Sequence, residues 1–321
     1  MILSFFKRLF GGGPPEDMVE LKTEAGKVLR IPWSDYEATL LRKVKNQGSD
    51  AVVLRDVAQV FADWRRFDKA LQVLQQLTAL PAATDEDFVL HARCLSESGR
   101  GAEAETLLQG RIAQHPRAIG LRVALAYLAD ARKDAALALR IAREAVALDP
   151  DAAEPLRLLY ALEKAARGSD GAEAALREVA SQNPRAAAPF QVLGQYAEHA
   201  APERAAALYE EGLRRNPRHE ALLSALAANF GARGLLDELI QRFDPIVAEG
   251  YAMDFALYVS VAEAHFAKGN KGRVLALYNE RMQRGPDLHK RMARQKLNEF
   301  KERVAAQGGP AGGGMPPLLG H

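Results

Sequence analysis

The segment that decides the fold is residues 204–217, RAAALYEEGLRRNP. Alanine, leucine, glutamate and arginine dominate it, and all four have high helix propensity. Pro217 ends the predicted helix because proline lacks a backbone N–H. Gly212 lies inside that helix, where a glycine costs roughly 1 kcal/mol relative to alanine. A glycine at that position indicates a place where a second helix packs closely.

Prolines recur at a nearly constant interval along the chain. Successive members of the set lie 35, 34, 34 and 33 residues apart, and they are Pro81, Pro116, Pro150, Pro184 and Pro217. The next stop falls at Gly250 and Tyr251, and the one after it at Pro286. Between these stops each unit contains two amphipathic helical segments and no strand pattern. A fixed period of this length is typical of repeat architectures.

Small and large residues recur in register within the units. The second segment of each unit repeats one three-residue spacing upstream of its proline. The sets are Ala104, Leu108 and Arg111; Ala138, Ala142 and Ala145; Ala172, Leu176 and Val179; and Ala205, Tyr209 and Gly212. First segments also align, as in LRDVAQVF (54–61), FQVLGQYA (190–197) and YVSVAEAH (258–265). The sixth unit departs from this spacing with Leu239 and Pro245, which predicts a kink or looser packing there.

This pattern resembles the tetratricopeptide repeat (TPR) family, and the resemblance covers about residues 48–286, or seven units. It implies an all-α fold, a right-handed α-solenoid of antiparallel helix pairs with a concave and a convex face. It also implies a protein-binding role in the concave groove. The groove positions carried over by the resemblance are Arg55, Gln59, Arg93, Tyr127, Arg157, Lys164, Gln191 and Gln195. The alternative for these side chains is ordinary solvated polarity.

Four further segments flank the predicted solenoid. Residues 1–17 combine a short amphipathic segment with a Gly/Pro tether, and residues 18–47 are predicted to form a β-hairpin and a capping helix. After the repeats, residues 287–306 are predicted to form a terminal capping helix, and residues 307–321 a disordered tail. Ser34 and Glu37 have the spacing of a capping box. The apolar residues of the first segment are Ile2, Leu3, Phe5, Phe6, Leu9 and Phe10. Three readings stay open for it: membrane contact, docking on the chain itself or a partner, and a disordered end.

The terminal capping helix is predicted to place Leu288, Met292, Leu297, Phe300 and Val304 on one side. Lysines and arginines occupy its other side. A polar cap at the end of a repeat array explains such a face, and nucleic-acid binding is the alternative. The absence of aromatic residues among the charges argues against that alternative.

The sequence lacks the patterns that carry chemistry. There is no phosphate-binding loop, dinucleotide fingerprint or nucleophile elbow, and the seven histidines show no metal-ligand spacing. Cys94 is predicted to be a small packed residue and His265 a core residue. We therefore predict no enzyme activity, cofactor or metal. A formal net charge of +2 also argues against a dedicated polyanion binder.

These observations predict a non-enzymatic scaffold or adaptor that binds a protein or peptide in its groove. A regulatory or targeting subunit of an enzyme complex and a nucleic-acid-associated factor are the two alternatives. A single cysteine and the lack of a secretory signal or membrane span predict a cytoplasmic location, with membrane association through residues 1–10 left open. The partner, the cellular process and the oligomeric state do not follow from the sequence.

Overall fold

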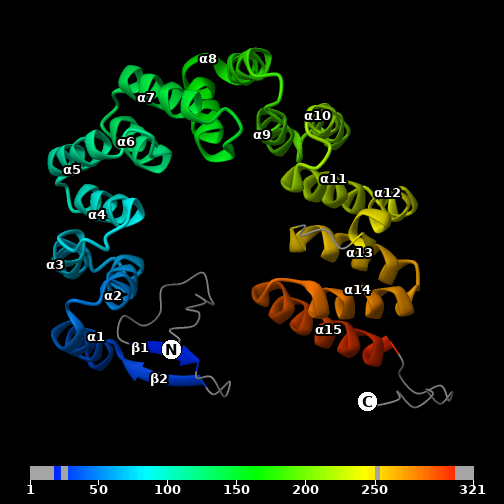
Figure 1. Ribbon diagram of the computed structural model, residues 1–321, viewed down its shortest axis with the longest axis horizontal. Coiled ribbons are helices and arrows are strands. Elements are labelled where there is room, and N and C mark those ends of the chain that lie inside the picture. The colour runs from blue at the N-terminus through cyan, green and yellow to red at the C-terminus, as the bar shows by residue number, and fades with distance from the viewer. Residues whose placement is uncertain (1–17, 23–27, 250–253, 308–321) are drawn as a thin grey trace. The chain divides into compact units, whose positions relative to one another are not determined.

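The computed structural model describes residues 18–22, 28–249 and 254–307 (Figure 1). The predictions for residues 1–10, for the tether at 11–17 and for residues 308–321 lie outside these ranges. The strands are β1 (Met18–Lys22) and β2 (Val28–Pro32). The helices are α1 (Trp33–Gln47), α2 (Ala51–Asp63), α3 (Phe67–Thr78), α4 (Asp85–Glu97), α5 (Gly101–Gln114), α6 (Ile119–Ala131), α7 (Ala135–Leu148), α8 (Ala153–Gln182), α9 (Ala188–Ala197), α10 (Pro202–Arg215), α11 (Glu220–Ala232), α12 (Leu236–Ala248), α13 (Phe255–Ala267), α14 (Lys271–Arg284) and α15 (Asp287–Gln307).

The predicted all-α fold with a small hairpin is confirmed. Helices follow each other as packed antiparallel pairs, beginning with α2 and α3. Helix α8 contains the two helices of one pair, and Gly168, with φ 75° and ψ −178°, forms the break between them. Only glycine adopts that combination readily.

A left-handed residue recurs at the turn inside most pairs. Among the described residues, those with positive φ are Arg65, Gly99, Lys133, Gly168, Gly234 and Gly269. Four of the six are glycines, which adopt this conformation without a Cβ penalty. Arg65 (φ 56°) and Lys133 (φ 65°) adopt it with a side chain present. The repeat is therefore also visible in the backbone conformation of its turns.

The N-terminal hairpin and α1 form one small packed element. β1 and β2 pair antiparallel, with Val19 opposite Ile31. The Trp33 ring of α1 stacks on Trp64 at the end of α2, with ring centroids 4.7 Å apart. The predicted capping box is wrong, because α1 begins at Trp33 and no side chain caps its N-terminus. Glu37 instead accepts a hydrogen bond of 2.9 Å from the Trp33 indole N–H.

The described chain divides into two compact units. The first contains everything up to Asp149 together with residues 157–172, and the second contains residues 150–156 and everything from Glu173 onward. Within the first unit, α2, α4 and α6 form one row and α3, α5 and α7 form a second (Figure 1). Leucine, valine and alanine side chains between the rows form a continuous core, which Leu158 and Leu162 of α8 join.

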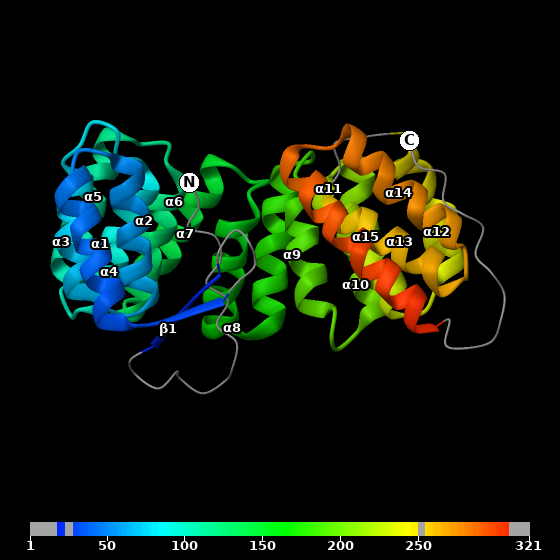
Figure 2. The same ribbon diagram turned by 90° about the horizontal axis from the view of Figure 1, so that it is seen from below.

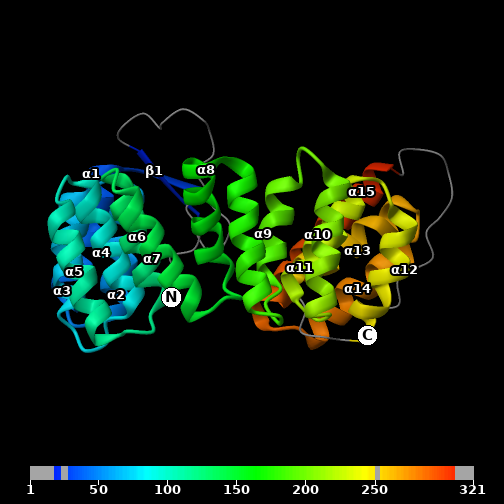
Figure 3. The ribbon, with the colours of Figure 1, turned by 90° about the horizontal axis from the view of Figure 1, so that it is seen from above.

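The second unit has its own core, built by α9 to α15. Helix α10 packs between α9 and α11, which lie beside it in Figure 3, and α15 packs against α14 (Figure 2). Ala293, Leu297 and Phe300 are the buried residues of α15. The prediction for Leu288 and Met292 is wrong, because their side chains are 57% and 39% exposed. Steps of 100° per residue place Leu297 opposite Leu288 on the helix, so one stripe cannot hold both.

Glycines in α9 and α10 mark the closest helix contacts of the second unit. A Cβ added to Gly194 would lie 2.2 Å from Cε1 of Tyr209. A Cβ added to Gly212 would lie 2.6 Å from Cδ1 of Leu222 and 3.2 Å from the Ala187 carbonyl oxygen. The distances of 2.2 and 2.6 Å are too short for a real side chain, and the distance of 3.2 Å is a tight contact. The close packing inferred for Gly212 from the sequence is present.

The pair α11 and α12 packs less extensively than the repeat pairs α2 with α3, α4 with α5, α6 with α7, α9 with α10 and α13 with α14, as the sequence predicted. Leu239 occupies the alanine position and is fully buried. Helix α12 continues through Pro245 to Ala248. The proline removes one backbone N–H from the helix and lies at an exposed position.

Candidate functional site

The predicted groove residues divide between the two units. Six of them lie on first helices of pairs in the first unit, on α2, α4, α6 and the first part of α8, and two lie on α9 in the second unit. The four on α2, α4 and α6 lie in the row that these helices form (Figure 1), and Arg157 and Lys164 lie on α8. They differ sharply in what their side chains already bind.

Arg55 is committed to a link between α2 and α4. Its Nε donates to Oδ1 of Asp87 at 2.6 Å and its Nη2 donates to Oδ2 at 2.7 Å. Asp87 is 1% exposed and its Oδ2 also accepts from the Thr84 backbone N–H at 2.8 Å, in a capping box at the start of α4. Burial raises the pKa of Asp87, but the bonds from Arg55 and Thr84 lower it to a value below the ordinary one. Removing one partner would leave the other charge without its counter-ion, so Arg55 has a structural role and is not available to a ligand.

Sequence reasoning missed the partner of Arg55, although a signal was available. The two residues are 32 positions apart, close to the repeat period. Other contacts have similar separations, such as Lys268 with Asp237 and Arg204 with Glu173. Opposite charges one period apart in a repeat sequence are therefore candidates for contacts between neighbouring units.

Gln59 is also engaged, since its Nε2 donates to Oδ1 of Asp63 at 2.7 Å on the same helix. In the second unit, Gln191 is 8% exposed and belongs to the interior, whereas Gln195 is exposed. Gln191 is thus placed for packing within α9.

Four predicted residues remain available to a ligand, and we call them the basic face: Arg93, Tyr127, Arg157 and Lys164. All are exposed, and the Tyr127 ring is 53% exposed. Arg93, Arg157 and Lys164 make no ion pair or hydrogen bond with the residues that the structure describes. α4 packs directly on α6, so Arg93 and Tyr127 lie on neighbouring helices. The face therefore offers three cations and one aromatic ring.

Buried charges beside Lys164 anchor the helix that presents it. Glu163 is 1% exposed and accepts hydrogen bonds from Arg143 at 2.6 Å and from Arg167 at 2.7 Å. Burial raises the pKa of Glu163, while the two arginines lower it to a net value below the ordinary one. The carboxylate is satisfied and ionised at neutral pH. Glu163 is thus occupied by the two arginines, and the neighbouring Lys164 is exposed.

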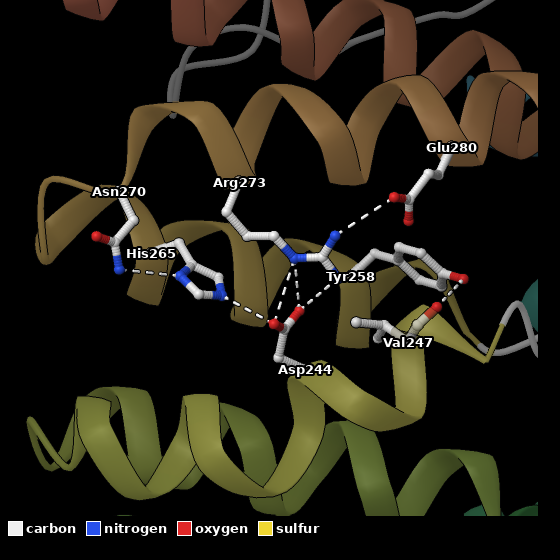
Figure 4. A network of polar contacts seen from close by, with 7 residues as sticks. All are labelled: Asp244, Val247, Tyr258, His265, Asn270, Arg273 and Glu280. Atoms are coloured by element: carbon white, nitrogen blue, oxygen red, sulfur yellow. Dashed lines mark hydrogen bonds and ion pairs between the residues drawn. The ribbon is translucent and has the colours of Figure 1, made fainter.

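A second polar cluster lies in the second unit, and we call it the Asp244 network (Figure 4). Asp244 of α12 binds Arg273 of α14 through bonds of 2.7 and 2.9 Å, and it lies 3.4 Å from Nε2 of His265 of α13. Asn270 contacts the other ring nitrogen of His265 at 3.3 Å. His265 is buried, as predicted. The network connects α12, α13 and α14. The residues drawn in Figure 4 include no serine, cysteine or threonine that could act as a nucleophile.

No described helix has the length and apolar character that crossing a bilayer requires. Among the described residues there is also no group of three or more His, Cys, Asp or Glu side chains arranged to hold a metal ion. Cys94 is fully buried, and burial raises the pKa of its thiol to about 11. A thiol in that state is a poor nucleophile at neutral pH.

Comparison with known proteins identifies the fold. No family model and no curated protein matches the sequence. Among solved structures, yeast Tom70 matches with a TM-score of 0.51 at 11% identity, over 87% of this chain and 60% of that chain. The chain thus spans less than two thirds of the Tom70 structure. A TPR protein from Parabacteroides merdae matches with a TM-score of 0.38 at 15% identity, over 78% of this chain and 98% of that one. PilF of Pseudomonas aeruginosa matches with a TM-score of 0.39 at 17% identity, over 69% and 96% of the chains. The similar structures are TPR-repeat proteins, and the likeness to Tom70 shows that this chain has the TPR fold.

Proposed function

We propose that this chain is a non-enzymatic scaffold that binds an acidic segment of a partner protein on its basic face. The observation that carries the proposal is the presence of three exposed cations on α4 and α8 that make no ion pair with the described residues, together with an exposed tyrosine on α6. Elsewhere in the first unit, many arginines have carboxylates to bind, as Arg55, Arg111 and Arg143 do. Arginines that the fold does not use are available to a ligand.

The chemistry of the face defines the ligand. Arginine binds carboxylates through two parallel N–H bonds, so Arg93 and Arg157 suit aspartate, glutamate or a chain terminus. Tyrosine is enriched among residues that dominate binding energy, because it combines a large apolar area with a hydroxyl group. Tyr127 supplies the apolar contact between the charges. The expected ligand is an extended segment with carboxylates on either side of an apolar residue.

Exposed charge pairs are individually weak, about 0.2–1 kcal/mol each. A ligand held mainly by three of them binds transiently and faster at low salt, because charge complementarity acts chiefly on the association rate. A regulatory or targeting subunit of an enzyme complex would use the same face, with the chemistry on its partner. Binding of residues 1–10 to a membrane stays a prediction.

The nucleic-acid alternative has little support from α15. Lys290, Lys296 and Arg303 of that helix pair with Asp287, Glu299 and Glu263. Those pairs reduce the charge available for phosphates. We therefore keep this alternative behind protein binding.

A pull-down followed by partner identification tests the proposal. It compares the native chain with the double variant Arg93→Glu and Arg157→Glu, each variant first checked for an unchanged melting temperature. The matched control is Arg185→Glu with Arg214→Glu, two exposed arginines of the second unit with the same change of charge. We expect the first variant to lose a partner that the control retains. Identical partners for all three proteins would remove the basic face as the binding site.

A further inference from the structure

The first unit contains a second surface with the opposite character, on the side of its second helices. A cleft of about 900 Å³ lies between α3 and α5, and α4 forms its floor. We call it the α3–α5 groove. Its volume falls within the range of pockets that bind small ligands or short peptides, roughly 300–1,000 Å³. None of the residues of the basic face lines it.

One wall of the groove is a polar stripe along α3. Asp68, Gln72 and Gln75 stand at positions i, i+4 and i+7, which places them on one face of the helix. All three are exposed, and none makes a hydrogen bond or ion pair with the residues that the structure describes. Each glutamine amide offers both a donor and an acceptor. Two such amides about one turn apart match the alternating N–H and C=O groups of an extended peptide.

The opposite wall, on α5, carries a charge pair that leaves the groove negative. Arg100 donates two hydrogen bonds of 2.7 Å to Glu103, so this carboxylate is already neutralised. Those bonds, together with the charges of Glu103 and Asp68, raise the pKa of Arg100. Both of these hydrogen bonds go to Glu103, and Asp68 acts on Arg100 through its charge. Asp68, Arg100 and Glu103 together have a net charge of −1, and Asp68 is exposed to solvent.

The floor of the groove is apolar. Leu71 and Leu95 are buried beneath it and Leu107 is half-buried at its edge. His91 also lines the floor, and its Nδ1 lies 3.4 Å from the hydroxyl of Thr78. Burial and the neighbouring Arg100 lower the pKa of His91, so the ring is neutral at pH 7. The floor thus accepts an apolar side chain and offers no cation to an anion.

We propose that the α3–α5 groove binds a short extended segment of a partner protein that carries a lysine or arginine next to a leucine-sized residue. Asp68 binds the cation, Gln72 and Gln75 bind the peptide backbone, and the leucines of the floor receive the apolar side chain. The charge of the site selects this ligand, because its unpaired group is a carboxylate. The inference is independent of the proposed function, since the basic face selects acidic segments.

The test uses a positional-scanning library of immobilised hexapeptides and the full-length chain. We expect the chain to enrich peptides with Lys or Arg beside Leu, Ile, Met or Phe. Two enriched hexapeptides, synthesised with a fluorescent label, are then measured by anisotropy. Asp68→Lys should weaken their binding at least tenfold, and Gln72→Ala with Gln75→Ala should weaken it several-fold.

A blocking variant and a matched control keep the test specific. Thr106→Trp places a large ring in the groove at an exposed position and should abolish binding without unfolding the chain. Asp170→Lys makes the same charge change on an exposed aspartate outside the groove and should leave binding unchanged. Enrichment of acidic peptides, or binding that survives both Asp68→Lys and Thr106→Trp, would overturn the proposal.

The chain's own residues 1–10 have the same chemistry as the expected ligand, with Lys7 and Arg8 among apolar residues. A synthetic peptide of that sequence is therefore included as a competitor. Failure to displace the labelled hexapeptides supports a partner chain as the occupant. Full displacement at equal or lower concentration would overturn that assignment in favour of the chain's own amino-terminal segment.

Discussion

Two regions of the second unit hold their helices together in different ways. Around α9 and α10, glycines admit the neighbouring side chains directly, with Tyr209 against Gly194 and Leu222 against Gly212. Around α12 to α14, the aligned positions carry Leu239 and Ile246, and the helices are joined by the Asp244 network (Figure 4). Close packing needs small residues at the crossing point. Where those residues are large, directional polar contacts supply the connection.

The region around α9 and α10 also contains polar contacts. The Tyr209 hydroxyl donates to Oε2 of Glu198 at 2.9 Å, and the buried Asn229 amide donates to Oε1 of the same carboxylate at 2.8 Å. Burial and the nearby carboxylate raise the pKa of Tyr209. The bond from Tyr209 holds its ring beside Gly194, and the bond from Asn229 holds the carboxylate that accepts it, so displacing the ring for a new side chain costs these contacts.

The largest expected effect is that of Gly212→Leu in α10. The glycine is enclosed by Leu222, Ala187 and Phe190, and a leucine there must displace a backbone carbonyl as well as side chains. Overpacking typically costs about 1–3 kcal/mol, and the enclosed site places this variant at the upper end or beyond. Urea denaturation measures the change. An unfolding free energy within 0.5 kcal/mol of the native value, roughly the scale of a surface substitution, would show that Gly212 is not a packing position.

Gly194→Ala should have the next largest effect, lowering the unfolding free energy by about 2 kcal/mol. The added methyl group collides with the fixed Tyr209 ring, and this loss exceeds the gain in helix propensity of roughly 1 kcal/mol. Gly110→Ala in α5 is the matched control, because nothing lies within 4 Å of its added Cβ. It should stabilise the chain. Opposite signs for the two glycines, in the same denaturation assay, are the expected outcome, and equal signs would contradict close packing at Gly194.

Asp244→Asn tests the polar side of the comparison, with an expected loss of about 1–2 kcal/mol. The amide cannot accept both bonds from Arg273 while also facing His265, so at least one group loses its partner. The hydrogen bond to Asp244 also raises the pKa of Arg273. Asp237→Asn, an exposed aspartate on the same helix, is the control. A loss no larger than that of the control would mean that packing alone holds α12 to α14.

The Arg55–Asp87 link of the first unit predicts a pH dependence. The folded-state pKa of Asp87 lies below its ordinary value, so the group stabilises the fold above about pH 4. That stabilisation disappears as the pH falls through the folded-state pKa. Melting temperatures recorded from pH 7 down to pH 2 should therefore fall less steeply for Asp87→Asn than for the native chain. Parallel curves would show that Asp87 is not held as a carboxylate.

The smallest expected effect comes from the turns. Lys133→Gly should stabilise the chain by about 0.5–1 kcal/mol, because glycine adopts φ 65° without a Cβ penalty. Gly99, Gly234 and Gly269 already supply that residue at equivalent turns. Lys271→Gly, at the exposed start of α14, is a control that should not stabilise. A destabilised Lys133→Gly variant would mean that the lysine side chain contributes contacts to the turn.

The period, the helix pairs and the role of Gly212 could be predicted from the sequence because the same residue types recur at the same positions of successive units. One residue fits several structures, but a pattern repeated in register fits few. The capping box at Ser34 failed because a local spacing competes with tertiary contacts, and Trp33 binds Glu37 instead. The face of α15 failed because five apolar residues within 17 positions do not fit one helical stripe. The commitment of Arg55 to Asp87 was invisible to a groove assignment made position by position. The α3–α5 groove had no sequence signal, since its walls come from separate helices.

The central claim, that the basic face binds acidic segments, is tested most directly by a charge swap with the partner that the pull-down identifies. Arg93→Glu is combined with Lys in place of each acidic residue of the bound segment in turn, and affinity is measured by calorimetry at 50 and 300 mM salt. We expect one swap to bind at least tenfold more tightly than Arg93→Glu with the native segment, and we expect native binding to weaken at high salt. Loss without restoration by any swap, and affinity independent of salt, would contradict it.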